Sequence, residues 1–102
     1  MVLREMVQLS IEAAVREKIE RIVDPGTGLS LGSMALITGI NETEEGVLKI
    51  DFVASTPYSP VTYSTALAIR EVALAQKGVK KVMVFCHNHV LSERINVDVN
   101  AR

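Results

Sequence analysis

The pattern that most constrains the fold is a strand, a helix and a second strand in immediate succession. In residues 47–54 apolar and polar side chains alternate, as in a strand with one buried face. Residues 60–77 carry apolar side chains at helical spacing and end at a lysine and a glycine, a typical helix stop. Residues 79–86, "VKKVMVFC", form the second strand. If the two strands are parallel, their carboxyl ends lie at the same edge of a sheet.

Residues 11–46 add two further elements to this unit. An amphipathic helix is predicted over 11–23, with Ser10 as its N-cap. A strand over 34–40 and a polar turn over 41–46 lead into the first strand of the unit as an antiparallel hairpin. The predicted fold class is therefore α+β, in the order α-β-β-α-β. A small three-stranded mixed sheet would have its helices packed on one face.

The length fits a single domain over residues 1–102. Residues 1–9 are read as an N-terminal extension, and residues 87–102 as a polar tail in which a short helix from about Ser92 is one expectation. No internal repeat or linker divides the chain.

Charge and composition exclude several classes of function. The net charge is −1, so no basic field indicates nucleic acid or an anionic membrane as a partner. The first ten residues contain charges and no long apolar stretch, which argues against a secretory signal. The single cysteine fits a reducing compartment, and we expect a cytoplasmic protein.

The segment "STPYSP" (55–60) lies where the first strand of the unit gives way to the helix. Hydroxyl groups beside free N–H groups at a helix start can bind an anion. Ser59 as N-cap and Pro60 at the first helical position explain the same residues as helix initiation. From these residues alone, helix initiation is the favoured interpretation.

The segment "CHNH" (86–89) gathers the only cysteine and the only two histidines of the chain. Thiolate and imidazole are ligands that zinc and iron prefer, so Cys86, His87 and His89 are candidate metal ligands. A buried cysteine followed by two solvated histidines is the simpler alternative. Catalysis by a Cys86 nucleophile is a third option, which adjacent residues on a strand disfavour because they seldom face one another.

Several motifs together resemble one known family. "DPGTG" (24–28) opens a stretch with apolar residues in register, and "STPYSP" supplies Thr56, Pro57 and Pro60. The matching positions of that first stretch are Asp24, Pro25, Gly28, Leu31, Leu36, Ile37 and Ile40. The chain resembles the iron–sulfur assembly domain family that includes SufT and PaaD, over about residues 10–95. The resemblance implies that family's fold and a role in metal-centre assembly.

The chain departs from this family at the positions that matter for chemistry. The family's cysteine corresponds to Ser59, and an aspartate of the family's signature corresponds to Ser33. Serine is a far poorer ligand for iron or zinc than thiolate. Two explanations stay open: the metal role is lost, or it has moved to Cys86 and its neighbouring histidines, close to the position of Ser59.

The expected function is a non-enzymatic accessory protein in assembly or maturation of iron–sulfur or other metal centres. Its partners would be client or scaffold proteins, and iron, an iron–sulfur cluster or zinc would bind transiently. The alternative is a metal-free protein-interaction module of a multi-subunit enzyme system such as an oxygenase. A homodimer is also expected, through a sheet edge or through the tail residues Val90, Leu91, Ile95 and Val97.

Overall fold

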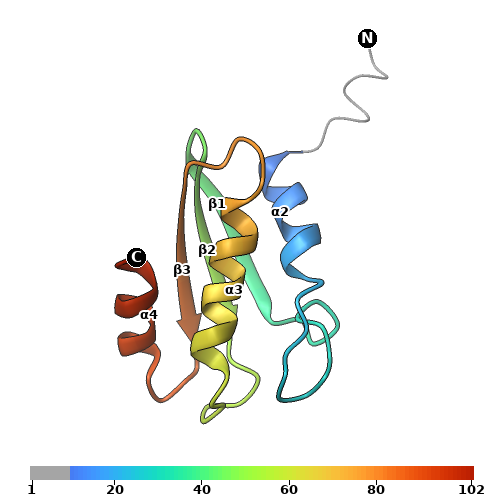
Figure 1. The fold of residues 1–102 in the computed structure, drawn as a ribbon, viewed down its shortest axis with the longest axis vertical. Helices are drawn as coiled ribbons and strands as arrows, with labels where there is room; N and C mark the ends of the chain where they lie inside the picture. Colours follow the sequence, from blue (N-terminus) through green and yellow to red (C-terminus); the bar gives the residue numbers. More distant parts are fainter. Residues whose placement is uncertain (1–9) are drawn as a thin grey trace.

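The computed structural model describes residues 10–102 and has the predicted element order (Figure 1). The predicted extension 1–9, with the segment that bears on a secretory signal, lies outside the described residues. No helix within residues 10–102 is both long and apolar enough to cross a membrane. The elements are α2 (Ile11–Ile19), β1 (Ile37–Glu44), β2 (Val47–Val53), α3 (Thr62–Leu74), β3 (Lys81–His87) and α4 (Ser92–Asn100).

The three strands form one mixed sheet in the order β1-β2-β3. β1 and β2 are antiparallel and β2 and β3 are parallel, so the predicted α+β class and mixed sheet are confirmed. The parallel register pairs Leu48 with Val82 and Val53 with His87. Both strands therefore end at the same edge of the sheet.

Two of the helices cover one face of this sheet and bury the core. α2 and α3 lie side by side over the sheet, whereas α4 lies beside β3 (Figure 1). The largest buried side chains come from both layers and include Val15, Ile19, Leu31, Leu48, Ile50, Phe52, Ile69, Val82, Val84 and Val99. Aliphatic side chains alternate along β2 and β3, which gives both strands one fully buried face.

The helix α2 is shorter than the predicted helix over 11–23. Ser10 caps it as expected, because its hydroxyl accepts a hydrogen bond from the Ala13 amide at 3.0 Å. The helix ends at Ile19 instead of residue 23. The loop that follows α2 supplies hydrogen-bond donors to carbonyl groups beyond the helix end. The Leu31 amide donates to the Ile22 carbonyl at 2.8 Å, and the Gly32 amide donates to the Glu20 carbonyl at 3.0 Å.

The first strand is longer and the turn shorter than predicted. β1 reaches Glu44, so most of the predicted turn 41–46 belongs to the hairpin and only Glu45 and Gly46 connect the strands. The acidic side chains point to solvent, and this polarity resembles that of a loop. Gly46 has a φ of +79° and lies against Gly78, where a Cβ would be 2.8 Å from the Gly78 carbonyl oxygen.

The helix after β2 starts later than predicted, and its predicted cap is wrong. α3 covers Thr62–Leu74 instead of 60–77, and Val61 is the N-cap, without a side-chain cap. Ser59 and Pro60 precede the helix as a turn. The Thr62 hydroxyl donates to the Ser59 carbonyl at 3.2 Å, which holds this turn outside the helix.

The third strand begins two residues later and ends one residue later than its predicted bounds 79–86. Val79 and Lys80 belong to the connection, because their amides donate to Gln76 and Gly46. β3 then runs from Lys81 to His87. The short helix expected from about Ser92 is present as α4.

α4 closes the outer edge of β3 with two asparagines one turn apart. The Asn100 side-chain amide accepts from the Val84 N–H and donates to the Val84 carbonyl, both at 2.8 Å. Asn96 does the same with Cys86, at 2.7 and 3.2 Å. The two side chains thus hydrogen-bond to β3 as a fourth strand would. They satisfy backbone N–H and C=O groups of an edge strand that could otherwise pair with a strand of another chain.

We expect Asn100→Ala to lower the free energy of unfolding by about 1–3 kcal/mol, because it leaves two part-buried backbone groups of β3 without partners. Urea titration followed by circular dichroism measures this change. Glu93→Ala, an exposed position of the same helix, serves as the control and should stay within about 0.5 kcal/mol of wild type. Equal stability of the two variants would show that the asparagine bonds contribute nothing.

Candidate functional site

Two loops meet at the carboxyl edge of the parallel strands. Loop 55–61 follows β2, and loop 88–91 follows β3. The pairing of the strands continues past their ends, since the Ala54 amide donates to the His87 carbonyl at 3.2 Å. The Val90 amide then donates to the Pro57 carbonyl at 3.0 Å. The predicted meeting of "STPYSP" and "CHNH" at one edge is therefore confirmed.

His89 fastens these two loops to each other. Its Nε2 lies 2.9 Å from the Ser59 carbonyl oxygen, which can only accept, so Nε2 carries the proton. Its Nδ1 accepts a hydrogen bond from the Leu91 amide at 3.0 Å. Both ring nitrogens of the neutral imidazole are thus engaged by backbone groups. His89 acts as a structural link here, and the lone pair that would bind a metal is occupied.

Cys86 lies inside the fold. Its side chain is 1% exposed, and its thiol approaches the His87 carbonyl at 3.7 Å. The Ser92 hydroxyl donates to the sulfur at 3.8 Å. Burial raises the pKa of the Cys86 thiol, and the hydrogen bond from Ser92 lowers this pKa by a smaller amount. The thiolate is the form that attacks substrates and binds metals, so this environment favours neither role.

His87 points away from both of these groups. Successive residues of a strand face opposite sides of the sheet, and His87 therefore leaves the side that Cys86 occupies. Its Nε2 lies 2.8 Å from Asp51 Oδ1 on the uncovered face. The three predicted ligands do not converge, and residues 10–102 contain no group of three or more histidine, cysteine or acidic side chains that could hold a metal. The donors among residues 10–102 do not fit a resident cluster or zinc ion.

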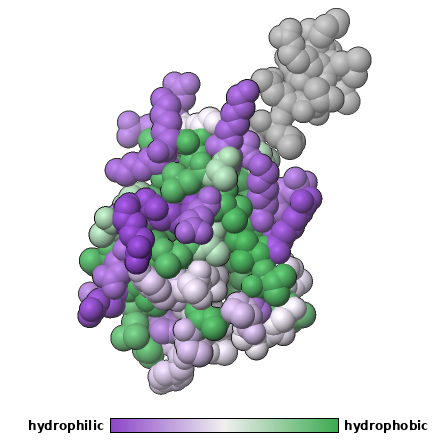
Figure 2. All heavy atoms as spheres, in the orientation of Figure 1, coloured by the Kyte–Doolittle hydropathy of each residue, from purple (hydrophilic) through white to green (hydrophobic). Residues whose placement is uncertain are grey.

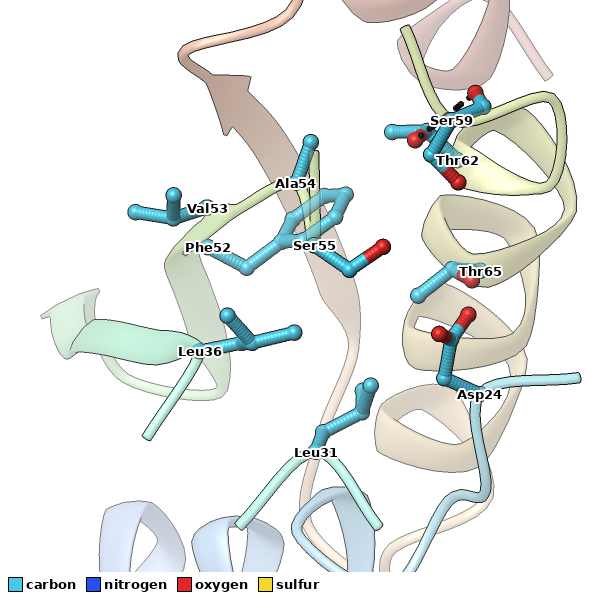
Figure 3. A pocket seen from close by; sticks show the side chains of 10 residues that line it. All are labelled: Asp24, Leu31, Leu36, Phe52, Val53, Ala54, Ser55, Ser59, Thr62 and Thr65. Carbon is cyan, nitrogen blue, oxygen red and sulfur yellow. Dashed lines mark hydrogen bonds between the residues drawn. The ribbon is translucent and has the colours of Figure 1, made fainter. Parts of the chain in front are cut away.

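Four of the predicted motif positions instead line one pocket: Asp24, Leu31, Leu36 and Ser59 (Figure 3). The pocket is small and open to solvent, with a cavity volume of about 10 Å³, which is room for about one water molecule. It lies between the segment after β2 and the first turns of α3. Its lining residues are Asp24, Leu31, Leu36, Phe52, Val53, Ala54, Ser55, Ser59, Thr62 and Thr65.

Asp24 begins a hydrogen-bonded turn over residues 24–28, and this turn directs its side chain into the pocket. Its amide donates to the Leu29 carbonyl, and its carbonyl accepts from the Gly28 amide at 2.7 Å. Gly28 has a φ of +74°, a conformation that suits glycine. The Thr27 amide donates to Asp24 Oδ2 at 3.2 Å, and the carboxylate is directed toward Thr65 (Figure 3). The "DPGTG" motif thus positions one carboxylate.

The polar and proline motif positions other than Asp24 and Ser59 lie outside the pocket. Pro25, Thr56, Pro57 and Pro60 are exposed in the two turns that flank it. Ser33 is exposed as well, and its hydroxyl donates to the Ser30 carbonyl at 2.8 Å. This contact makes Ser33 part of a local turn.

Sequence reasoning missed the hydroxyl groups that α3 contributes. Thr62 and Thr65 are 3% and 8% exposed and both line the pocket. Two threonines three residues apart on the buried side of a predicted helix were the available signal, because they share one face. Ser55 was not among the predicted site residues, and it too lines the pocket.

An apolar surface flanks the same edge. We call it the edge surface and define it by Pro57, Tyr58, Val90 and Leu91. Tyr58, Val90 and Leu91 are 77%, 57% and 58% exposed. In Figure 2 strongly hydrophilic side chains are concentrated toward the end opposite these loops, and the lower end of the molecule is paler. Exposed apolar side chains that cluster on one surface mark sites of protein interaction.

The comparisons with known proteins agree with this fold and with the family that the sequence resembles. Residues 12–84 match the family described as iron–sulfur cluster assembly protein. An uncharacterized protein of Methanocaldococcus jannaschii is 30% identical over 82 residues, which is 80% of this chain and 86% of that protein. The crystal structure of a domain of unknown function (DUF59) from Bacillus anthracis superimposes with a TM-score of 0.71 at 16% identity. It covers 96% of this chain and 99% of its own. The chain therefore belongs to the iron–sulfur cluster assembly protein family.

Proposed function

We propose that this chain is a non-enzymatic accessory protein in the assembly or maturation of iron–sulfur or other metal centres. It docks on a client or scaffold protein through the edge surface. The observation that carries this proposal is that the exposed apolar side chains of Tyr58 and Leu91 lie beside the loop of Ser59, the position that the resemblance aligns with the family's cysteine. In the described part of the chain, this edge combines an apolar surface with motif residues of the family.

The edge surface is supported by its own hydrogen bonds. The bond from Val90 to Pro57 and the two bonds of His89 fix both loops before a partner arrives. A preformed surface loses less conformational entropy on binding than a mobile loop does. This favours docking as the role of these residues.

Metal, in this proposal, is cargo that the partner carries. Within residues 10–102 no set of metal ligands converges. The Cys86 thiol is buried, both ring nitrogens of His89 are hydrogen-bonded, and His87 pairs with Asp51. Iron, a cluster or zinc would therefore contact this chain only transiently, with most ligands supplied by the partner. We expect a cytoplasmic protein.

A second candidate is a metal-free interaction module of a multi-subunit enzyme system such as an oxygenase. The replacement of the family's thiol by Ser59 favours it, because a hydroxyl binds iron and zinc poorly. The edge surface would serve docking in this case as well.

The expected homodimer stays a prediction, and the structure narrows where it could form. Ile95 is 6% exposed and unavailable for a contact. Asn96 and Asn100 already bond the outer edge of β3, and the Glu12 carboxylate accepts from the Glu42 amide at the edge of β1. Val90, Leu91 and Val97 remain exposed and available for such a contact.

We expect the double variant Tyr58→Ser, Leu91→Ser to fail as a replacement for the wild-type gene. Complementation of a deletion host, read out as the activity of its iron–sulfur enzymes, measures this. The reason is that large apolar side chains at the centre of an interface typically contribute about 1–3 kcal/mol each to binding. Val23→Ser is the control, since Val23 is also apolar, is 57% exposed and lies outside the edge surface.

Full activity of the double variant would contradict docking through the edge surface. Unchanged iron–sulfur enzyme activity in the deletion host itself would contradict the accessory role and leave the metal-free module.

Anaerobic titration with zinc or ferrous iron tests the location of metal ligands. We expect no stoichiometric binding by the wild type or by Cys86→Ala, and at least about tenfold tighter zinc binding by Ser59→Cys, because the new thiol faces the pocket that Asp24 lines. Stoichiometric binding by the wild type that Cys86→Ala abolishes would instead place the metal at "CHNH".

A further inference from the structure

The two outer strands of the sheet differ in what covers their free sides. Along β3, Asn96 and Asn100 bond the backbone N–H and C=O groups of two residues. Along β1 the described residues make one such bond, in which the Glu42 amide donates to Glu12 Oε2 at 2.6 Å. No strand within residues 10–102 lies beyond β1 (Figure 1). The free side of β1 is therefore where a further strand could pair.

The register of the hairpin shows which backbone groups of β1 face outward. Residues 39–42 pair with β2 without a bulge, and the Glu42 amide points away from β2 toward Glu12. In an antiparallel pair every second residue has the same orientation, so the Ile40 N–H and C=O groups also point outward. No hydrogen bond joins them to a segment outside the sheet within residues 10–102. Both groups of Ile40 and the Glu42 carbonyl are thus available to a partner.

The charge along this side of β1 selects the partner. Glu42 and Glu44 are exposed, and β1 contains no basic residue. Within residues 10–102 no lysine, arginine or histidine nitrogen lies within 4.0 Å of these carboxylates or of Glu12. A second copy paired through β1 would place like charges beside each other, which destabilises a strand pair. A strand with lysine or arginine would instead bring opposite charges.

We propose that the outer side of β1 binds an extended, basic segment of a partner protein as a fourth strand. The backbone of that segment bonds to Ile40 and Glu42, and one of its carbonyl groups replaces the Glu12 carboxylate at the Glu42 amide. Glu12 and Glu42, which lie on the helix-covered side of the sheet, then pair with basic side chains of the segment. The inference goes beyond the proposed function and does not depend on it, because loops 55–61 and 88–91 take no part.

NMR titration of the ¹⁵N-labelled chain with the peptide acetyl-TKVKVKT-amide tests this. Its lysines alternate and therefore lie on one side of a strand. We expect saturable shifts of the Ile40 and Glu42 amide signals and at least about tenfold slower hydrogen exchange of the Ile40 amide at saturation. The peptide acetyl-TEVEVET-amide, with glutamate in place of lysine, should not bind.

Two N-methylated forms of the basic peptide separate strand pairing from simple charge attraction. One carries methyl groups on the backbone nitrogens of its lysines, and the other carries them on its valines. Only one of these sets of N–H groups faces β1, so we expect one form to bind at least about tenfold more weakly and the other to bind more nearly as the parent does. Equal affinity of both forms and the parent peptide would overturn the proposal.

The double variant Glu12→Gln, Glu42→Gln locates the charge. Both glutamines keep an acceptor oxygen, for the Glu42 amide and for the Gly46 amide, which Glu42 Oε2 accepts at 2.9 Å. We expect the affinity for the basic peptide to fall about three- to tenfold, since exposed ion pairs contribute modestly. Glu71→Gln, Glu93→Gln is the control, because both acids are exposed on other helices, and it should bind as wild type does.

Hydrogen exchange of the free chain tests whether β1 is open and names other occupants. Slow exchange of the Ile40 amide in the dilute free chain would show that this side is already covered and would overturn the proposal. Exchange that slows as the protein concentration rises, without peptide, would assign β1 to a second copy and contradict the basic partner. Each of these results leaves docking through the edge surface unaffected.

Discussion

The parallel pairing of β2 with β3 places two distant segments of the chain beside each other. Its register aligns Val53 with His87, and the backbone bond from Ala54 to His87 carries the pairing one step further. Loop 55–61 and loop 88–91 must then leave the sheet at the same edge. The bonds of His89 fasten them together, so the edge surface exists before any partner binds. If the strands were antiparallel, these loops would lie at opposite ends of the sheet.

The candidate site combines oxygen-bearing side chains with a buried thiol that does not reach them. Ser59 lines a pocket with Asp24, so this chain has oxygen atoms at the position that the family resemblance aligns with a cysteine. The chain's own thiol, Cys86, lies at the end of β3 but faces the core, and burial raises its pKa. The fold therefore presents a small pocket with oxygen-bearing side chains in its lining beside an apolar surface. Thiol and imidazole ligands do not converge at this edge of the sheet. This combination favours recognition of a partner over storage of a metal.

The sequence predicted the elements that depend on periodicity and missed those that depend on contacts between distant residues. The alternation in 47–54 and the helical spacing in 11–23 and 60–77 were sufficient for the element order. The asparagine bonds to β3 were not predictable, because nothing local distinguishes Asn96 and Asn100 from solvated helix residues. The polar composition of residues 41–44 led to the wrong prediction of a turn there. These residues form the acidic end of β1 and pair with β2.

The candidate site shows the same division. Ser59 and Asp24 were found through a family resemblance, but their common pocket follows from packing of the 24–28 turn against α3. Ser59 looked like a helix cap, and its carbonyl is instead taken by Thr62 and His89. Clustering in sequence suggested a metal site at "CHNH". Strand geometry separates Cys86 from His87, and a loop bond occupies His89.

The most direct test of the central claim is a complete substitution scan of the exposed positions, selected by growth that requires iron–sulfur enzymes. If the carboxyl edge is the functional surface, exposed positions that tolerate no polar substitution will concentrate in loops 55–61 and 88–91. The opposite end, at the β1–β2 turn and the connection before β3, will accept nearly all changes. Intolerant exposed positions that concentrate at that opposite end, or spread evenly over the molecule, would contradict the claim.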